Sequence, residues 1–113
     1  MALWQEIIFL REYAKNKLWC VENVVPYYDV LVTPTAILQR HCFWSNFPIH
    51  KRAFAIDNLR NSQVGELQEH HGIDLSAYKL DKREALRNCV HPPIGLHILS
   101  MARAATKAQL TLI

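Results

Sequence analysis

The stretch Leu18-Trp19-Cys20-Val21-Glu22-Asn23-Val24 decides the fold class, because a short apolar run ends there in an acid. The continuous apolar residues 18–21 are typical of a strand that is buried on both faces of a parallel sheet. Upstream, residues 3–14 repeat apolar side chains at helical spacing, and the basic residues within 15–17 suit the end of that helix. A helix, a short turn and a buried strand make half of a repeating α/β unit. We therefore expect an α/β fold.

Two further candidate strands come next, at Ile37-Leu38 and at residues 42–44, on either side of Gln39-Arg40-His41. Pro26 and Pro34 break the region before them into loop and short extended pieces. These pieces predict a small hairpin.

The last part of the chain carries helix signals. A short helix is expected around residues 64–68, begun by a polar residue at 61–62 and ended by Gly72. The capping-box spacing of residues 81–84 predicts the start of a second helix. Pro93 suits the first residue of a final helix. The buried stripe of that helix is expected to consist of Ile94, Ile98, Met101, Ala102 and Ala105.

Length and composition limit the class of protein. A chain of 113 residues is long enough for one small domain and too short for two. No apolar run is long enough to cross a bilayer, so no membrane partner is expected. The net charge of +3 mildly favours a nucleic-acid partner. Cys20, Cys42 and Cys89 are odd in number and far apart, which favours reduced thiols and a cytoplasmic location.

Glu22 is the first candidate for chemistry, because it directly follows the predicted buried strand. In open α/β sheets, ligands bind beyond the carboxyl ends of the strands. A carboxyl group that is held partly out of water can stay protonated at neutral pH and donate that proton. The alternative is a structural role, in which Glu22 caps a neighbouring helix or pairs with a surface lysine.

Three stretches of the chain resemble, in the same order, motifs of the DNA cytosine-5 methyltransferases. Residues 19–24 look like the Glu-Asn-Val motif, and residues 37–47 resemble the arginine-bearing motif that follows it. Residues 87–92, which lead into the last helix, are similar to the closing Gly-Asn-x-Val motif. The sequences around these motifs look most like those of compact bacteriophage or prophage members.

The resemblance implies that residues 1–113 are the C-terminal portion of a methyltransferase catalytic domain. The first two motifs then lie within 18–47, and the closing motif and last helix within 81–106. The implied fold is an incomplete Rossmann-type α/β domain with one or two parallel strands, a small hairpin and flanking helices. DNA is the implied partner, and S-adenosylmethionine is the implied cofactor.

The resemblance also implies roles for single residues. In that family a cysteine attacks a flipped-out cytosine, and S-adenosylmethionine supplies the methyl group. Glu22 would hydrogen-bond the ring nitrogen and the exocyclic amine of the cytosine. Asn23 would brace the active-site loop, and Arg40 would contact the cytosine oxygen or the nucleotide's phosphate. Asn88 and Val90 would line the cofactor pocket.

Two motifs of the family have no counterpart in this sequence. None of the cysteines follows a proline, and the three glycines form no Phe-x-Gly-x-Gly loop. We therefore expect the chain alone to transfer no methyl group. It would be either a subunit of a split enzyme or the remnant of a truncated gene. S-adenosylmethionine would bind only with the missing N-terminal motifs, and an exposed sheet edge would favour a second polypeptide or self-association. The alternative is a non-catalytic DNA-binding or protein-interaction module derived from a methyltransferase.

Basic and aromatic side chains give weaker indications of a DNA partner. Lys51, Arg52 and Arg60 are candidates for phosphate contacts, and a solvated basic surface explains them equally well. Aromatic side chains stack on bases in some nucleic-acid sites, but more often they belong to a core or an interface. The aromatic candidates are Trp19, Trp44, Tyr27 and Tyr28.

The histidines and cysteines do not predict a metal site. The pairs His70-His71, His41-Cys42 and Cys89-x-His91 fit no standard zinc spacing. We interpret these histidines as exposed residues at helix ends, and the cysteines as ordinary packed side chains.

Overall fold

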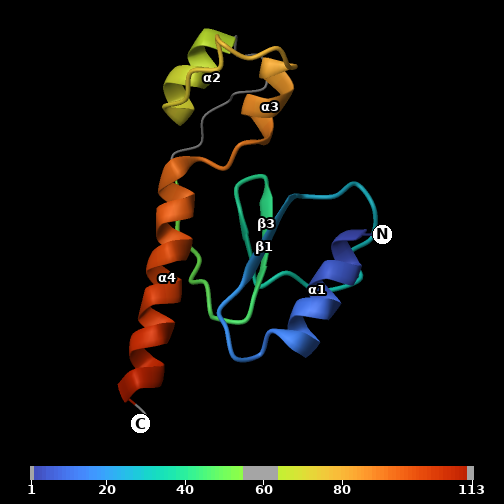
Figure 1. Cartoon of the computed structure of the whole chain (residues 1–113), viewed down its shortest axis with the longest axis vertical. Coiled ribbons are helices and arrows are strands. Elements are labelled where there is room, and N and C mark those ends of the chain that lie inside the picture. Colours follow the sequence, from blue (N-terminus) through green and yellow to red (C-terminus); the bar gives the residue numbers. More distant parts are fainter. Residues whose placement is uncertain (1, 55–63, 112–113) are drawn as a thin grey trace.

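The computed structural model describes residues 2–54 and 64–111 of the chain. Its elements, in order, are α1 (Ala2–Tyr13), β1 (Cys20–Val24), β2 (Ala36–Leu38), β3 (His41–Ser45), α2 (Val64–His71), α3 (Lys82–Asn88) and α4 (Pro92–Thr111). Figure 1 shows α1 and α4 on opposite sides of a small sheet, with α2 and α3 together beyond one end of it. The fold is therefore a small mixed α/β arrangement.

The sheet has the strand order β1-β3-β2, and both of its pairings are antiparallel. β2 and β3 form the expected hairpin, and β1 pairs with β3 from Cys20 opposite Ser45 to Val24 opposite His41. The expectation of parallel strands is wrong for the strands that the structure describes. The prediction of burial on both faces is wrong as well, because Cys20 and Glu22 are exposed and the other residues of β1 are only half-buried. The short apolar run therefore indicated a strand but neither its burial nor its direction.

The first strand begins two residues later than predicted, at Cys20 instead of Leu18. Asn46 explains this shift, because its side chain binds the backbone just before the strand. Its Nδ2 donates to the Lys17 carbonyl at 2.6 Å, and its Oδ1 accepts from the Trp19 amide at 2.9 Å. These side-chain bonds hold residues 17–19 outside the regular ladder.

Each face of the sheet carries its own apolar cluster. On the α1 side, Trp4 and Ile7 pack against Cys42 and Trp44. The rings of Trp4 and Trp44 meet edge to face, with centroids 5.6 Å apart. On the α4 side, the buried members are Ala36, Leu38, Phe43, Phe47, Ile49 and Ile94. Two thin cores thus share one sheet.

The helices follow the local signals. Asp81 caps α3, since its Oδ1 accepts from the Glu84 amide at 3.1 Å. Gly72, with φ +68°, ends α2 as predicted, whereas the predicted start at 61–62 lies outside the described residues. Ile94 is fully buried in α4. The rest of the predicted stripe packs against the same cluster, through Ile98, Met101, Ala102 and Ala105.

The molecule is elongated, with a radius of gyration of 16.1 Å and extents of 49 × 32 × 27 Å. Figure 1 shows that α4 runs on past the sheet. Within residues 2–54 and 64–111, no helix has the length and apolar character that crossing a membrane requires.

Candidate functional site

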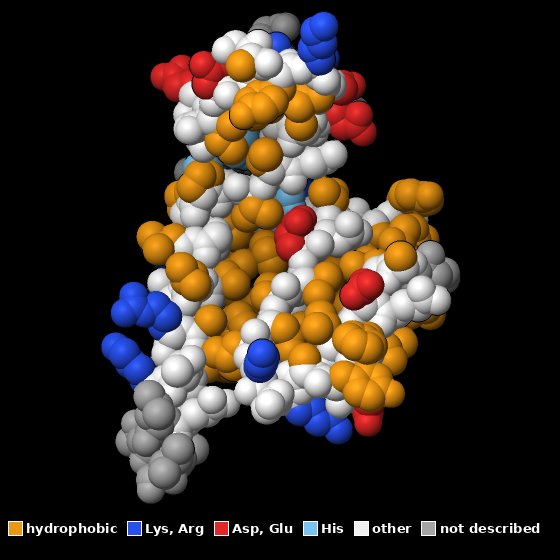
Figure 2. Space-filling view, in the orientation of Figure 1, with side chains coloured by type: hydrophobic (Ala, Val, Ile, Leu, Met, Phe, Trp, Pro, Cys, Tyr) orange, Lys and Arg blue, Asp and Glu red, His pale blue; other side chains and the backbone are white. Residues whose placement is uncertain are grey.

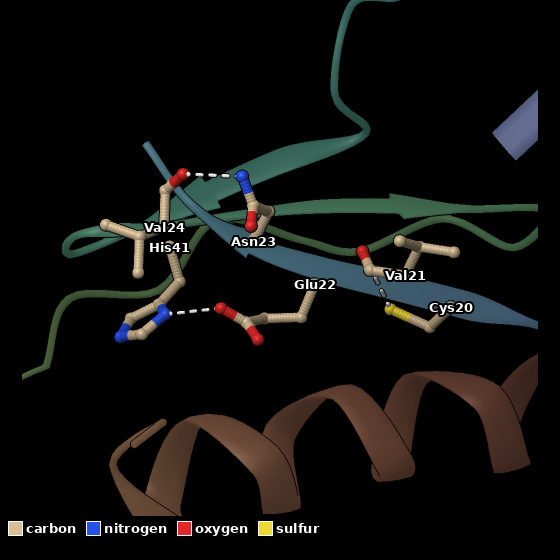
Figure 3. A network of polar contacts seen from close by, with 6 residues as sticks. All are labelled: Cys20, Val21, Glu22, Asn23, Val24 and His41. Atoms are coloured by element: carbon tan, nitrogen blue, oxygen red, sulfur yellow. Dashed lines mark hydrogen bonds and ion pairs between the residues drawn. The ribbon is translucent and has the colours of Figure 1, made fainter. Parts of the chain in front are cut away.

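Glu22 lies in the middle of β1 and not beyond the end of a strand, as the sequence had led us to expect. The strand continues to Val24, because Asn23 and Val24 still pair with Cys42 and His41 of β3. Figure 3 shows the Glu22 side chain on the face of the sheet that looks towards α4. The carboxyl group therefore projects from the face of the sheet towards α4.

A buried histidine holds the Glu22 carboxyl group. His41 Nδ1 and Glu22 Oε1 are 2.7 Å apart, and the side chains are 6% and 35% exposed, respectively. A carboxylate oxygen can only accept, so the proton of this hydrogen bond belongs to His41 Nδ1. In Figure 3 the second carboxyl oxygen points away from the imidazole. One oxygen of Glu22 is thus fixed, and the other is directed elsewhere.

The thiol of Cys20 responds to the same carboxylate. Cys20 is exposed as a residue. Figure 3 shows its sulfur on the α4 side of β1, which is also the side of the Glu22 carboxyl group. Loss of solvent around the sulfur and then the negative charge of Glu22 raise the pKa of the Cys20 thiol to about 11. The same two causes raise the pKa of Cys42. Both thiols are therefore protonated at neutral pH and poor nucleophiles.

Asn23 points to the opposite face from Glu22. Its Nδ2 donates to the Val24 carbonyl at 3.1 Å, so it braces its own strand in this structure. An active-site loop that Asn23 could brace, as predicted, would have to belong to other sequence.

Arg40 lies in the tight turn between β2 and β3, directly before His41. The preceding Gln39 adopts φ 54°, and the Arg40 carbonyl accepts from the Val25 amide at 2.8 Å. The Arg40 side chain lines a cleft of about 360 Å³ together with Asn88. The other residues lining it are Asp81, Arg83, Glu84 and Arg87. The turn thereby brings the arginine motif and the closing motif to the same place.

The two predicted cofactor residues are separated. Asn88 lines the charged cleft beside Arg40, whereas Val90 packs against the apolar cluster under α4. A cleft lined entirely by charged and amide side chains offers no apolar wall for an adenine ring. These residues by themselves do not fit S-adenosylmethionine.

The structure describes two of the three residues that were predicted to contact phosphate. Lys51 and Arg52 are exposed, and the Arg52 guanidinium lies over the Phe54 ring, 5.4 Å from its centroid. Arg60 lies outside the described residues. Nothing brings Lys51 and Arg52 into the cleft that Arg40 lines.

A second basic cavity was missed by the sequence reasoning. It has a volume of about 620 Å³, and its walls include the basic side chains Arg11, Lys15 and Lys17. Trp19 and Asn46 also line it. The run at 15–17 was interpreted only as the end of a helix, and the tie between Asn46 and Lys17 could not be read from the sequence.

The aromatic candidates divide between core and surface. Trp44 is 1% exposed, and its Nε1 donates to the Val32 carbonyl at 2.8 Å. Tyr27 is fully exposed, and its ring meets that of Tyr28 at 5.3 Å. Trp44 is therefore a core residue, and Tyr27 and Tyr28 are the ones open to a partner.

Three histidines come together at the other end of the molecule. His70 and His71 end α2, His91 precedes α4, and one ring nitrogen from each lies within 4.8 Å of the others. The expectation of an exposed histidine is wrong for His71, which is 6% exposed. It lies one helical turn after the buried Leu67, on the same face of α2.

Comparison with protein-family models, with curated proteins and with solved structures finds no match to this chain.

Proposed function

We propose that this chain is the C-terminal part of a DNA cytosine-5 methyltransferase, built as an incomplete Rossmann-type domain. It would supply the cytosine-binding Glu22, and the cofactor pocket would come from other sequence. The observation that carries the proposal is that one side-chain contact and one shared cleft link the three motif-like stretches. Glu22 is bound to His41, its neighbour Arg40 lies in the turn, and Arg40 and Asn88 line one cleft.

The chemistry of Glu22 suits a flipped cytosine. A carboxyl group with one fixed oxygen can turn its other oxygen to the edge of a base. When protonated it donates to the ring nitrogen, and as a carboxylate it accepts from the exocyclic amine. His41 fixes the side chain in one rotamer, and so limits the entropy that is lost when the base binds. In this proposal His41 is a positioning residue for Glu22.

Arg40 suits the anion or the carbonyl oxygen that comes with such a base. Its guanidinium presents several donors in a rigid plane, which matches a phosphate group better than a lysine does. Arg83 and Arg87 line the same cleft and add positive charge. The acids Asp81 and Glu84 partly offset that charge, so the cleft keeps only a small excess of positive charge.

Other sequence has to supply the attacking thiol and the glycine-rich cofactor loop. Cys20 and Cys42 do not serve as the nucleophile, because their thiols stay protonated at neutral pH. The exposed surface fits a partner: β1 pairs on one side only among the described strands. A polypeptide that carries the Pro-Cys motif would complete the sheet there and close over Glu22.

Reconstitution tests the proposal. The chain is co-expressed with a methyltransferase N-terminal segment that carries the Pro-Cys and glycine-rich motifs, and transfer of labelled methyl groups to DNA is measured. We expect methylation by the pair and none by either part alone. Glu22→Gln should abolish methylation and leave the complex intact. Glu12→Gln is the matched control, since Glu12 is an exposed acid on α1 whose ion pair with Lys15 spans 3.8 Å.

The outcomes separate clearly. Methyl transfer by the purified chain alone would contradict the proposal. So would a soluble complex whose activity survives Glu22→Gln. Loss of activity with Glu12→Gln as well would show that the effect of Glu22→Gln is not specific to Glu22.

A protein-interaction or DNA-binding module without catalysis is the second candidate. Large apolar side chains outside the sheet favour it: Phe9, Tyr13, Tyr27 and Leu31 are 56%, 74%, 100% and 66% exposed. Such a module would bind its partner equally well with Glu22→Gln. If DNA is the partner, the lone chain should bind it with an affinity that falls steeply as salt rises.

A further inference from the structure

The three-histidine group formed by His70, His71 and His91 brings the end of α2 close to the residue before α4. Two of its members end α2, and the third lies immediately before α4. One ring nitrogen of each lies within 4.8 Å of the other two, and among the described residues no acid belongs to the group.

His71 is the member with an unmet chemical requirement. Its side chain is buried, at 6% exposed, and neither ring nitrogen makes a hydrogen bond within the described residues. A buried imidazole normally has a partner, and a neutral one is the form that binds a metal ion.

The spacing of the nitrogens is close to that of a metal site. Zinc binds imidazole nitrogens at about 2.0–2.1 Å, which places tetrahedral ligands about 3.3 Å apart. The rings of His70 and His91 are stacked, with centroids 4.2 Å apart and planes at 11°, so their lone pairs are parallel and do not converge. One of the two has to turn about its terminal torsion, which is soft, and both are only half-buried.

We propose that His70, His71 and His91 bind one divalent transition-metal ion, of the class that prefers imidazole, such as Zn²⁺. The ion satisfies the buried ring of His71 and ties the end of α2 to the start of α4. Three imidazoles leave the fourth position of a tetrahedral ion to water or to a group from a partner. Cys89 is only two residues from His91, but its sulfur is not among the converging atoms.

Metal titration of the full, untagged chain tests this proposal. After treatment with a chelator, the chain is titrated with ZnCl₂ by calorimetry and with CoCl₂ by visible absorption. We expect one ion per chain and a Co²⁺ spectrum of low coordination number. His70→Gln and His91→Gln should each weaken Zn²⁺ affinity at least about tenfold, since even an outer-shell partner of a ligand contributes that much.

The controls separate this site from chance binding. His50→Gln changes an exposed histidine on a different segment and should leave affinity unchanged. Cys89→Ser should do the same. The two test variants replace half-buried residues, so the experiment does not depend on whether a His71 variant folds, and circular dichroism verifies their helices. No Zn²⁺ uptake by the unaltered chain would overturn the proposal. Unchanged affinity in either test variant, or an equal loss with His50→Gln, would also overturn it.

Discussion

Glu22 stands between two groups that respond to its charge in different ways. The buried imidazole of His41 donates a hydrogen bond to it at 2.7 Å, and the thiol of Cys20 is held back from ionising by it. His41 thus holds the Glu22 carboxylate in place, and the charge of this carboxylate raises the pKa of Cys20. This gives a way to follow its charge without any partner or substrate.

We predict that Glu22→Gln lowers the pKa of the Cys20 thiol below its value of about 11. Removing a negative charge makes the thiolate less unfavourable, so the shift is downward. Loss of solvent is the larger cause and stays, so the pKa should not fall all the way to that of an exposed thiol. The alkylation rate of Cys20 as a function of pH, measured by peptide mass spectrometry, reports the change.

Glu12→Gln serves again as the control and should leave the Cys20 profile where it was. An unchanged profile in Glu22→Gln would mean that the carboxylate is too far away or too well solvated to act on the thiol. Peptide mapping keeps Cys20 separate from the buried Cys42 and the half-buried Cys89.

Single residues could be named from the sequence only as candidates, where a local motif marked them. Glu22 and Arg40 were singled out from their own motifs. His41 was missed as the partner of Glu22, because the pair depends on Val24 lying opposite His41 in the ladder. That register joins residues that are far apart in the sequence, and no local pattern encodes it.

The helix α4 is the element on which the larger part of the core depends. Its residue Ile94 is fully buried against the sheet, whereas Leu96, two residues later, is 66% exposed. Both are aliphatic and lie in the same turn of the same helix. They therefore form a matched pair for measuring what packing contributes.

We predict that Ile94→Ala lowers the free energy of unfolding by about 2–5 kcal/mol, from lost transfer energy and the cavity left behind. Leu96→Ala should change it by less than about 0.5 kcal/mol, as is usual at exposed positions. Urea unfolding followed by circular dichroism measures both. Equal effects of the two substitutions would mean that α4 does not pack on the sheet as described.

Elements were predictable to the extent that their ends are marked. Asp81, Gly72 and the prolines before α4 carry their signals in the chain itself. The start of β1 did not, because Asn46, which holds back residues 17–19, lies beyond the hairpin. Strand direction was also not predictable, since it is set by the pairing of β1 with β3, and β3 lies far along the chain.

The whole molecule has more surface than a chain of its mass normally keeps. It exposes 8295 Å², against about 6,400 Å² for a typical folded monomer of this size. Its radius of gyration of 16.1 Å compares with about 13 Å for a compact domain of this length. Figure 2 shows apolar side chains gathered in the hollow between α4 and the sheet. This surface is suited to being covered by other protein.

We predict concentration-dependent self-association of the isolated chain, seen by sedimentation velocity. Phe9 and Tyr13 form an exposed aromatic pair on α1, with centroids 5.0 Å apart. The double substitution Phe9→Ser with Tyr13→Ser should reduce association by removing apolar area. The pair Leu96→Ser with Leu99→Ser, on the exposed side of α4, is the comparison. A monomer at all concentrations would contradict the prediction.

The strand order has a consequence for the time course of folding. β1 comes first in the chain, yet its only neighbour among the described strands is β3, which is complete only at Ser45. The β2–β3 hairpin closes over a turn of two residues and can form early, whereas docking of β1 must close a much longer loop. During synthesis, then, β1, which bears Glu22, leaves the ribosome before β3 and stays unpaired until β3 has been made. Any chain that competes for β3 has that interval in which to take its place.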